Sequence, residues 1–441
     1  MIPEPVKKVL INPLFIILAA GLAVRLILAP MFADYSDFSF WAGISFDVRE
    51  EGSIYRDYDL WYPPVWGYVI SAFSPLLDLF GCTPLEGVVD EASSIGYAVG
   101  DGWIPSPAAV FVIKLPIIIS DVLCGFFIHS IVLRISDDRR KALLSAALWT
   151  FCPLTIYVSA VQGQFDSIQV LLVILAVWSY LNGSYFPAGA FVALSVLTKP
   201  FSALIVLPLL ALIITYEYGN KRHVKSALGY IAGGLVMTAF VCVPIILNGE
   251  TQFLTGFMSN RYSSGFPLPS GFSMSMLPVS ESFGLAPSGS NMNTFFFLSI
   301  LLSLMLSVFI LARGKLKDSY AVLIVLMASC LHLIWYPATG YVQYYVMAIA
   351  ALAVASSVDV RFRYLAYAVT VLALIPAFWG FNHAYQLYEY GWVSVDALEN
   401  AYSTMRSIFD IPDTIASHLK FLPMLLAVVL SAIILRRDAV E

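Results

Sequence analysis

The chain has 441 residues, of which 59% are hydrophobic and only 12% are charged, and its mean hydropathy is +0.82. Soluble domains carry roughly 25% charged residues, so the composition excludes a soluble protein and indicates a polytopic membrane protein. The net charge of -5 identifies no partner, because the position of the positive residues in a membrane protein matters more than their sum, and the sequence has no basic patch of the kind that binds nucleic acid.

Apolar runs long enough to cross a bilayer follow one another along the chain. The first is too long for a signal-peptide core and no small-residue cleavage site follows it, so we expect a retained span. The fifth is short, and Lys199-Pro200 after it indicates a broken or partly inserted helix pair. The twelve predicted spans are 10–31, 109–134, 142–160, 166–182, 185–198, 201–217, 226–247, 294–312, 319–336, 342–357, 364–381 and 419–435.

Basic residues gather at alternate ends of these spans, which identifies the cytoplasmic face and places both termini on it. The apolar segment 64–80 would reverse every later cluster if it were a span, so we expect an interfacial or re-entrant helix there. The outer face then carries the long loops 31–107, 248–293 and 381–418. The basic residues concerned are Lys7, Lys8, Arg134, Arg139, Arg140, Lys141, Lys221, Arg222, Lys225, Arg313, Lys315, Lys317, Arg361, Arg363, Arg436 and Arg437.

Two carboxylates, Asp34 and Asp37, directly follow the first span. A carboxylate near hydrocarbon is costly to keep ionised, so one found there usually has a partner or a function. Three residues apart, the two share one face of a short helix and are candidates for a general base acting on a substrate hydroxyl. The alternative is a pair of solvated loop acids that end the span.

Further along this loop, Trp61, Tyr62 and Trp66 surround a stiff proline pair. Aromatic residues at an interface are more often a membrane belt than ligand contacts, although Trp61 and Tyr62 are also candidates for binding a substrate. The junction of the third and fourth spans is a polar patch, 162–167, where a hydrophobic hairpin would suffice. There Gln164 and Asp166 are candidate substrate contacts, while Asp166 is equally compatible with helix capping.

Two cations on the outer side are candidates for binding a phosphate. Lys199 stands alone between two apolar runs, where it would either snorkel to the headgroups or pair with a phosphate as a point charge. Arg261 in the second outer loop has the fork geometry for bidentate phosphate binding. For both, phosphate binding and a plain structural role stay open.

Other polar residues in the apolar runs have simpler explanations. Lys114 and Asp121 lie on one face of the second span and are interpreted as a buried contact of the bundle. The single histidines His129 and His332 are interpreted as core residues, and the five cysteines form no disulfide framework or metal-ligand spacing. We expect no cofactor, although Asp34 and Asp37 are placed so that a divalent cation at this pair is not excluded.

The order of these motifs resembles the GT-C superfamily of polytopic glycosyltransferases, in particular dolichol-pathway glucosyltransferases and mannosyltransferases and their prokaryotic relatives. The resemblance covers roughly residues 30–215. Gln343-Tyr344 resembles a Gln-Tyr near a late helix of some archaeal members. The motifs are Asp34 to Trp41, Gly52 to Tyr55, Tyr62-Pro63-Pro64, Lys114-Leu115-Pro116 with Asp121, Gly163 to Ser167, and Leu197-Thr198-Lys199-Pro200.

The resemblance implies an all-α bundle with a conserved-type GT-C module at 1–217, containing the catalytic outer loop, and a variable module at 218–441. It implies an inverting transfer of a hexose, mannose or glucose, from a polyprenyl- or dolichyl-phosphate donor to a lipid-linked glycan or glycolipid at the extracytoplasmic face. Asp34 would be the base, with Asp37 as the rival. The alternative from another class is a secondary transporter or lipid flippase, in which Arg25, Lys114 and Asp121 would line a path.

Overall fold

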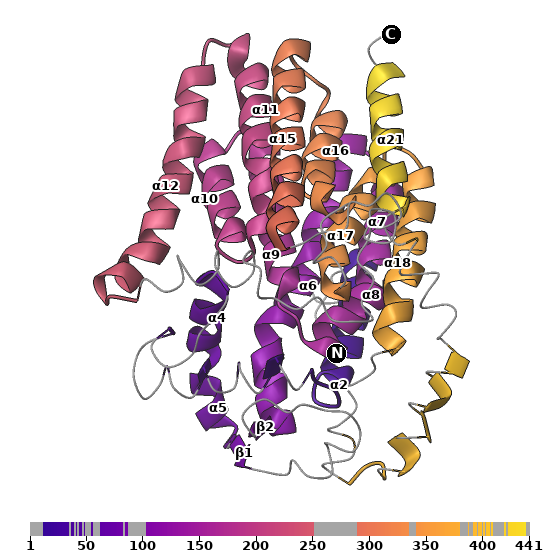
Figure 1. Cartoon of the computed structure of the whole chain (residues 1–441). Helices are drawn as coiled ribbons and strands as arrows, with labels where there is room; N and C mark the ends of the chain where they lie inside the picture. The colour runs from indigo at the N-terminus through magenta and orange to yellow at the C-terminus, as the bar shows by residue number, and fades with distance from the viewer. Residues whose placement is uncertain are drawn as a thin grey trace, which may run out of the picture.

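The computed structural model describes residues 12–34, 62–82, 84–86, 103–250, 289–334, 341–379 and 422–437, together with isolated positions between 37 and 55 and between 387 and 419. It is a helical bundle in which most helices run along one long axis (Figure 1). α6 runs from the end that carries α4 and α5 to the opposite end, where α21 also ends (Figure 1).

Every one of the twelve predicted spans contains a helix. The helices concerned are α2 (Pro13–Leu28), α6 (Pro107–Ser136), α7 (Arg139–Thr150), α8 (Pro153–Ile156), η3 (Tyr157–Gln162), α9 (Asp166–Leu181), α10 (Tyr185–Val196), η4 (Pro200–Ile205), α11 (Val206–Tyr218), α12 (His223–Leu247), α15 (Gly289–Arg313), α16 (Asp318–Ala328), η5 (Leu331–Ile334), η7 (Val342–Tyr345), α17 (Val346–Ala355), α18 (Arg361–Trp379) and α21 (Leu422–Arg437).

The helices differ in how well they fit a bilayer. Within the described residues, three are both long and apolar enough to cross a membrane: 107–136, 200–218 and 223–247. A fourth span results if α7 and the 153–162 helix are counted as one that bends by 44°. The shorter apolar helices, of 10 to 17 residues, include α2, α9, α10 and α16. The fold class is as predicted, whereas the number of twelve crossings stays a prediction.

The predicted third span is not one straight helix, because α7 ends at Thr150 and Pro153 begins the next helix. Proline cannot donate the backbone hydrogen bond that a continuous helix needs, so the chain restarts there. The restarted helix then widens into the π-helix η3, a conformation that often accompanies functional sites.

The apolar segment 64–80 folds as two short helices, α4 (Val65–Phe73) and α5 (Pro75–Leu79), with Pro75 at the start of the second. They lie at one end of the bundle (Figure 1). Beside them, β1 (Pro84–Glu86) and β2 (Trp103–Pro105) form a two-stranded antiparallel sheet that the sequence analysis did not predict.

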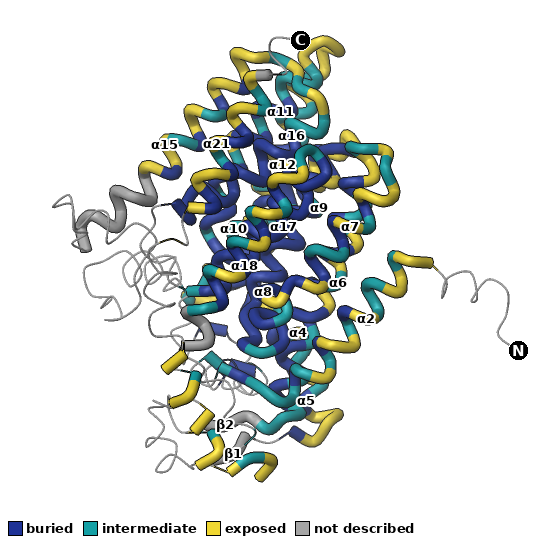
Figure 2. The backbone as a smooth tube through the Cα atoms, turned by 90° about the vertical axis from the view of Figure 1, so that its right-hand side faces the viewer, coloured by how far each residue is buried: buried dark blue, intermediate teal, exposed yellow. Residues whose placement is uncertain are grey.

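Burial is deepest along the middle of the bundle, in particular in α9 and α17, and falls toward α12 (Figure 2). α12 leaves large apolar side chains such as Leu235 and Phe240 exposed, as a helix that faces lipid does. It joins the bundle through a close crossing with α10. A Cβ on Gly189 would lie 1.9 Å from the Tyr230 carbonyl oxygen, and one on Gly233 would lie 2.0 Å from that of Phe186.

Candidate functional site

The site is organised by a turn of five residues, Gln162 to Asp166, between η3 and α9, which we call the central turn. The turn depends on Gly163, whose φ of +79° is a left-handed conformation that residues with a Cβ rarely adopt. A Cβ there would also lie 2.3 Å from the Phe38 ring and 2.6 Å from the Lys114 side chain. Glycine thus lets the chain turn while two neighbouring segments approach its backbone.

The acidic motif after α2 contacts this turn. The Asp34 N–H donates to the Gln162 carbonyl oxygen at 3.3 Å, and the Asp34 carbonyl accepts from the Phe38 N–H at 2.8 Å. The side-chain amide of Gln164 donates to the Asp37 carboxylate. Both aspartates are half-buried. The structure therefore brings the neighbouring aspartates Asp34 and Asp37 together with Gln164, which is 127 positions beyond Asp37.

Lys199 meets the other end of the central turn. Its ammonium lies 2.7 Å from an Asp166 carboxylate oxygen, and both side chains are less than 5% exposed. The same ammonium faces the rings of Phe165 at 4.6 Å and Tyr344 at 5.3 Å, distances at which a cation is attracted to an aromatic face. Gln169 donates to the Lys199 carbonyl at 3.0 Å. Lys199 is thus a buried, paired cation, and the interpretation of a snorkelling side chain is wrong.

Aromatic residues of the first outer loop pack against Phe165. Trp66 stacks on its ring with centroids 4.8 Å apart and is fully buried, so it packs inside the protein and does not belong to a membrane belt. Tyr62 meets Phe165 edge-on at 5.0 Å and lies 5.7 Å from the Lys199 ammonium. Burial raises the pKa of Tyr55, so its hydroxyl stays protonated and donates to the Tyr62 carbonyl at 2.8 Å.

Two of the predicted site residues, Trp61 and Arg261, lie outside the described residues. The structure does not test their roles in substrate and phosphate binding. The remaining candidates in the described part of the chain, beside the two aspartates and Lys199, are Gln164, Asp166 and Tyr62. Gln164 and Asp166 belong to the central turn, and Tyr62 contacts it through Phe165.

The second half of the chain contributes two residues that the sequence analysis did not assign to the site. The Gln162 amide donates to the Gln343 side chain at 3.4 Å, and the Tyr344 ring faces Lys199. A small cavity with room for about one water molecule lies between Asp166, His332 and Gln343. The Gln343-Tyr344 motif was the feature of the sequence that could have indicated these two residues. Its contact with the central turn could not be predicted, because the two lie far apart in the sequence.

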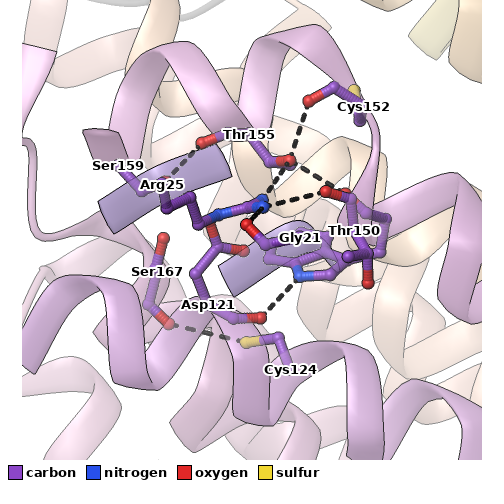
Figure 3. Close-up of polar contacts among 10 residues, drawn as sticks. Gly21, Arg25, Asp121, Cys124, Thr150, Cys152, Thr155, Ser159 and Ser167 are labelled. Carbon is purple, nitrogen blue, oxygen red and sulfur yellow. Dashed lines mark hydrogen bonds and ion pairs between the residues drawn. The ribbon is translucent and has the colours of Figure 1, made fainter. Parts of the chain in front are cut away.

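The intramembrane charges invoked for a transporter are engaged in contacts inside the bundle. Arg25 on α2 pairs with Asp121 on α6 at 2.6 Å and donates to the Thr150 carbonyl at 2.9 Å and to the Thr155 hydroxyl at 3.2 Å (Figure 3). Both charged side chains are at most 1% exposed. Arg25 thereby holds both sides of the break between α7 and α8, a structural role.

Lys114 pairs with main-chain carbonyls rather than with Asp121, so the two residues form separate contacts. Among the residues that the structure describes, no group of three or more His, Cys, Asp or Glu side chains gathers as a metal site would require. Binding of a cation by Asp34 and Asp37 stays untested.

Comparison with known proteins identifies the class. Residues 108–247, less than half of the chain, match the model of the dolichyl-phosphate-mannose-protein mannosyltransferase family. The matched region begins in α6 and includes the central turn and Lys199. Together with the structural match below, this confirms the predicted resemblance: the chain is a polytopic membrane protein with the GT-C fold. The match also supports glycosyl transfer as its class of activity.

Among solved structures, ArnT from Cupriavidus metallidurans, crystallised with undecaprenyl phosphate, is similar over 93% of this chain and 75% of its own, with a TM-score of 0.50 and 16% identity. The apo oligosaccharyltransferase of Archaeoglobus fulgidus aligns over 92% of this chain and 56% of its own at 12% identity, and its TM-score of 0.40 is too low to establish a shared fold. A search of curated proteins found no match.

Proposed function

We propose that the chain is an inverting glycosyltransferase that moves a hexose, mannose or glucose, from a polyprenyl- or dolichyl-phosphate donor to a lipid-linked glycan or glycolipid. The observation that carries this proposal is the central turn, which joins a half-buried pair of carboxylates at one end to a buried cation at the other. ArnT, with the same fold, was crystallised with undecaprenyl phosphate, which is the kind of carrier proposed here.

The carboxylates supply the base. Asp34 accepts a proton from an acceptor hydroxyl, the hydroxyl oxygen attacks the anomeric carbon, and the lipid phosphate leaves from the opposite face with the bonding electrons. Inversion follows because the attacking and leaving oxygens are on opposite faces. Asp37 is the rival base, and its carboxylate accepts a hydrogen bond from the Gln164 amide.

The leaving phosphate needs positive charge nearby. We assign this role to Lys199, whose pair with Asp166 keeps the ammonium in a fixed place, and to Arg261 in the second outer loop. Tyr62 and Trp61 would also contact the substrate. The chemistry needs no cofactor, and chelation of divalent cations is expected to leave the rate unchanged. The active site would face the periplasm, lumen or cell exterior, with residues 1–217 as the conserved-type module and 218–441 as the variable one.

The experiment is sugar transfer in nanodiscs from a panel of polyprenyl-phosphate hexoses to a membrane glycolipid extract. Asp34→Asn is expected to abolish transfer while donor binding is retained, because the charge is lost with little change of shape. Asp359→Asn serves as a matched control, since Asp359 forms an exposed ion pair with Arg361 away from the central turn. Full activity of Asp34→Asn with loss in Asp37→Asn would move the base to Asp37, and no transfer from any donor would contradict the proposal.

A further inference from the structure

Lys114 is a fully buried cation whose partners are main-chain carbonyls. Its ammonium donates to the carbonyl oxygens of Ala29 at 3.1 Å, Phe32 at 2.5 Å, Ala160 at 2.7 Å and Val161 at 3.1 Å. An ammonium has three N–H donors, so at least one of them is shared between two carbonyls. The side chain is 0% exposed, and its Nζ lies 5.2 Å from the centre of the Phe38 ring.

These four carbonyls belong to two segments. Ala29 and Phe32 follow the end of α2, five and two residues before Asp34, whereas Ala160 and Val161 are in η3, directly before the central turn. Carbonyls at the end of a helix have no helical N–H to accept from, and the end of a helix carries partial negative charge. Two such ends converge on one ammonium, which explains how a cation is tolerated at this depth.

The turn itself leaves the η3 carbonyls free for Lys114. The N–H groups of Gly163 and Gln164 both donate to the Val158 carbonyl, each at 2.9 Å, so they are not available to the carbonyls that follow it. Lys114 takes the place of the missing donors. Gly163 also has to be glycine for this reason, since a Cβ there would lie 2.6 Å from the Lys114 side chain.

We infer that Lys114 is a positioning residue for the proposed reaction: it fixes the backbone that carries Asp34 to the central turn that carries Gln164 and Asp166. The inference rests on the proposed function, because Lys114 matters to the reaction only through Asp34. Asp34 is also close enough for its charge to act on the Lys114 ammonium. Besides Lys114, the 3.3 Å bond from the Asp34 N–H to the Gln162 carbonyl and the bond from the Gln164 amide to Asp37 join the acidic motif to the central turn.

The test uses the full chain with Lys114→Met, which keeps a long unbranched side chain and removes the N–H donors. Hydrogen exchange followed by mass spectrometry is expected to show amide exchange at least tenfold faster in peptides 29–38 and 158–166, with α12 and α18 unchanged. Lys141→Met is the matched control, because Lys141 also donates to a main-chain carbonyl, that of Ser357 at 3.1 Å, away from both segments. Lys114→Gln keeps two N–H donors and replaces Lys114→Met if that variant does not fold.

Kinetics separate positioning from overall stability. Misplacement of a reacting group by about 1 Å costs on the order of 100-fold in rate, so kcat per folded molecule is expected to fall by about that factor while the KM for the polyprenyl-phosphate hexose is unchanged. Unaltered exchange in both peptides of a folded Lys114 variant would overturn the inference, and so would faster exchange with full kcat. If the wild-type chain transfers no sugar, the proposed function fails, whereas the exchange data still decide whether Lys114 joins the two segments.

Discussion

Gly163 shows how much one residue determines in this site. Its left-handed conformation sets the direction in which the chain leaves η3, and its missing Cβ leaves room for Phe38 and Lys114. The central turn therefore contacts the acidic motif through backbone as well as side chains. Neither requirement is satisfied by any other residue type without strain or displacement of a neighbour.

Gly163→Ala is therefore expected to reduce both stability and sugar transfer. Gly183→Ala is a close control, because Gly183 also has a positive φ, of +69°, but a Cβ there meets nothing within 4 Å. The control is expected to lose about 1 to 2 kcal/mol from the left-handed conformation alone. Gly163→Ala carries this cost and the collision as well, so thermal unfolding in detergent should occur at a clearly lower temperature. Equal unfolding temperatures of the two variants would show that the close approach of Gly163 to Phe38 does not contribute to stability.

Most of the described residues that meet at the central turn are candidates from the sequence, whereas few of their partners are. Asp34 and Gln164 are recognisable because polar residues stand at junctions where apolar ones would suffice. The pairing of Lys199 with Asp166 is a tertiary contact between two spans, and no spacing rule predicts it. Gln343 joins the site through a contact with Gln162 across 181 positions, which a single sequence does not reveal.

At the level of elements, hydrophobic run length predicted where helices occur but not how they are interrupted. The break before η4 was expected from Lys199-Pro200, whereas the bend between α7 and α8 and the π-helix η3 were not. Pro153 gives a local reason for the bend. The π-helix has no such local signal, and the partner of its last carbonyls is Lys114, which lies in a different element.

The crossing of α10 and α12 gives a prediction at this scale. Gly233→Ala is expected to lower the unfolding temperature, since its Cβ would lie 2.0 Å from the Phe186 carbonyl and would push the helices apart. Gly229→Ala, one turn earlier on α12, has its nearest neighbour at 4.0 Å and should be neutral or stabilising by up to about 1 kcal/mol, because alanine favours a helix. Thermal unfolding of the two variants in one detergent measures the difference, and a Gly233→Ala protein as stable as Gly229→Ala would contradict close packing here.

For the whole molecule, the two proposed modules meet at the central turn. Residues 1–217 supply Asp34, Asp37, Asp166 and Lys199, while Gln343 and Tyr344 come from residues 218–441. The proposed second module therefore reaches the central turn, which is the proposed catalytic region. The buried pair of Arg25 and Asp121 bears on the transporter alternative. Both charges hold helices of the bundle together, which differs from the expected role of charges that line a transport path.

The orientation of the molecule in the membrane gives the last prediction. α5 and the connection between α11 and α12 lie at opposite ends of the bundle (Figure 1). Leu79 is the last residue of α5 and Tyr218 the last of α11, and they are 76% and 69% exposed. The basic residues Lys221, Arg222 and Lys225 follow Tyr218, so the positive-inside rule places that end in the cytoplasm.

In intact cells, a membrane-impermeant maleimide should label Leu79→Cys directly and Tyr218→Cys only after permeabilisation. The five native cysteines are all buried, which keeps background labelling low. The reverse pattern would place α4, α5 and the proposed active site on the cytoplasmic side, where the proposed extracytoplasmic transfer is impossible.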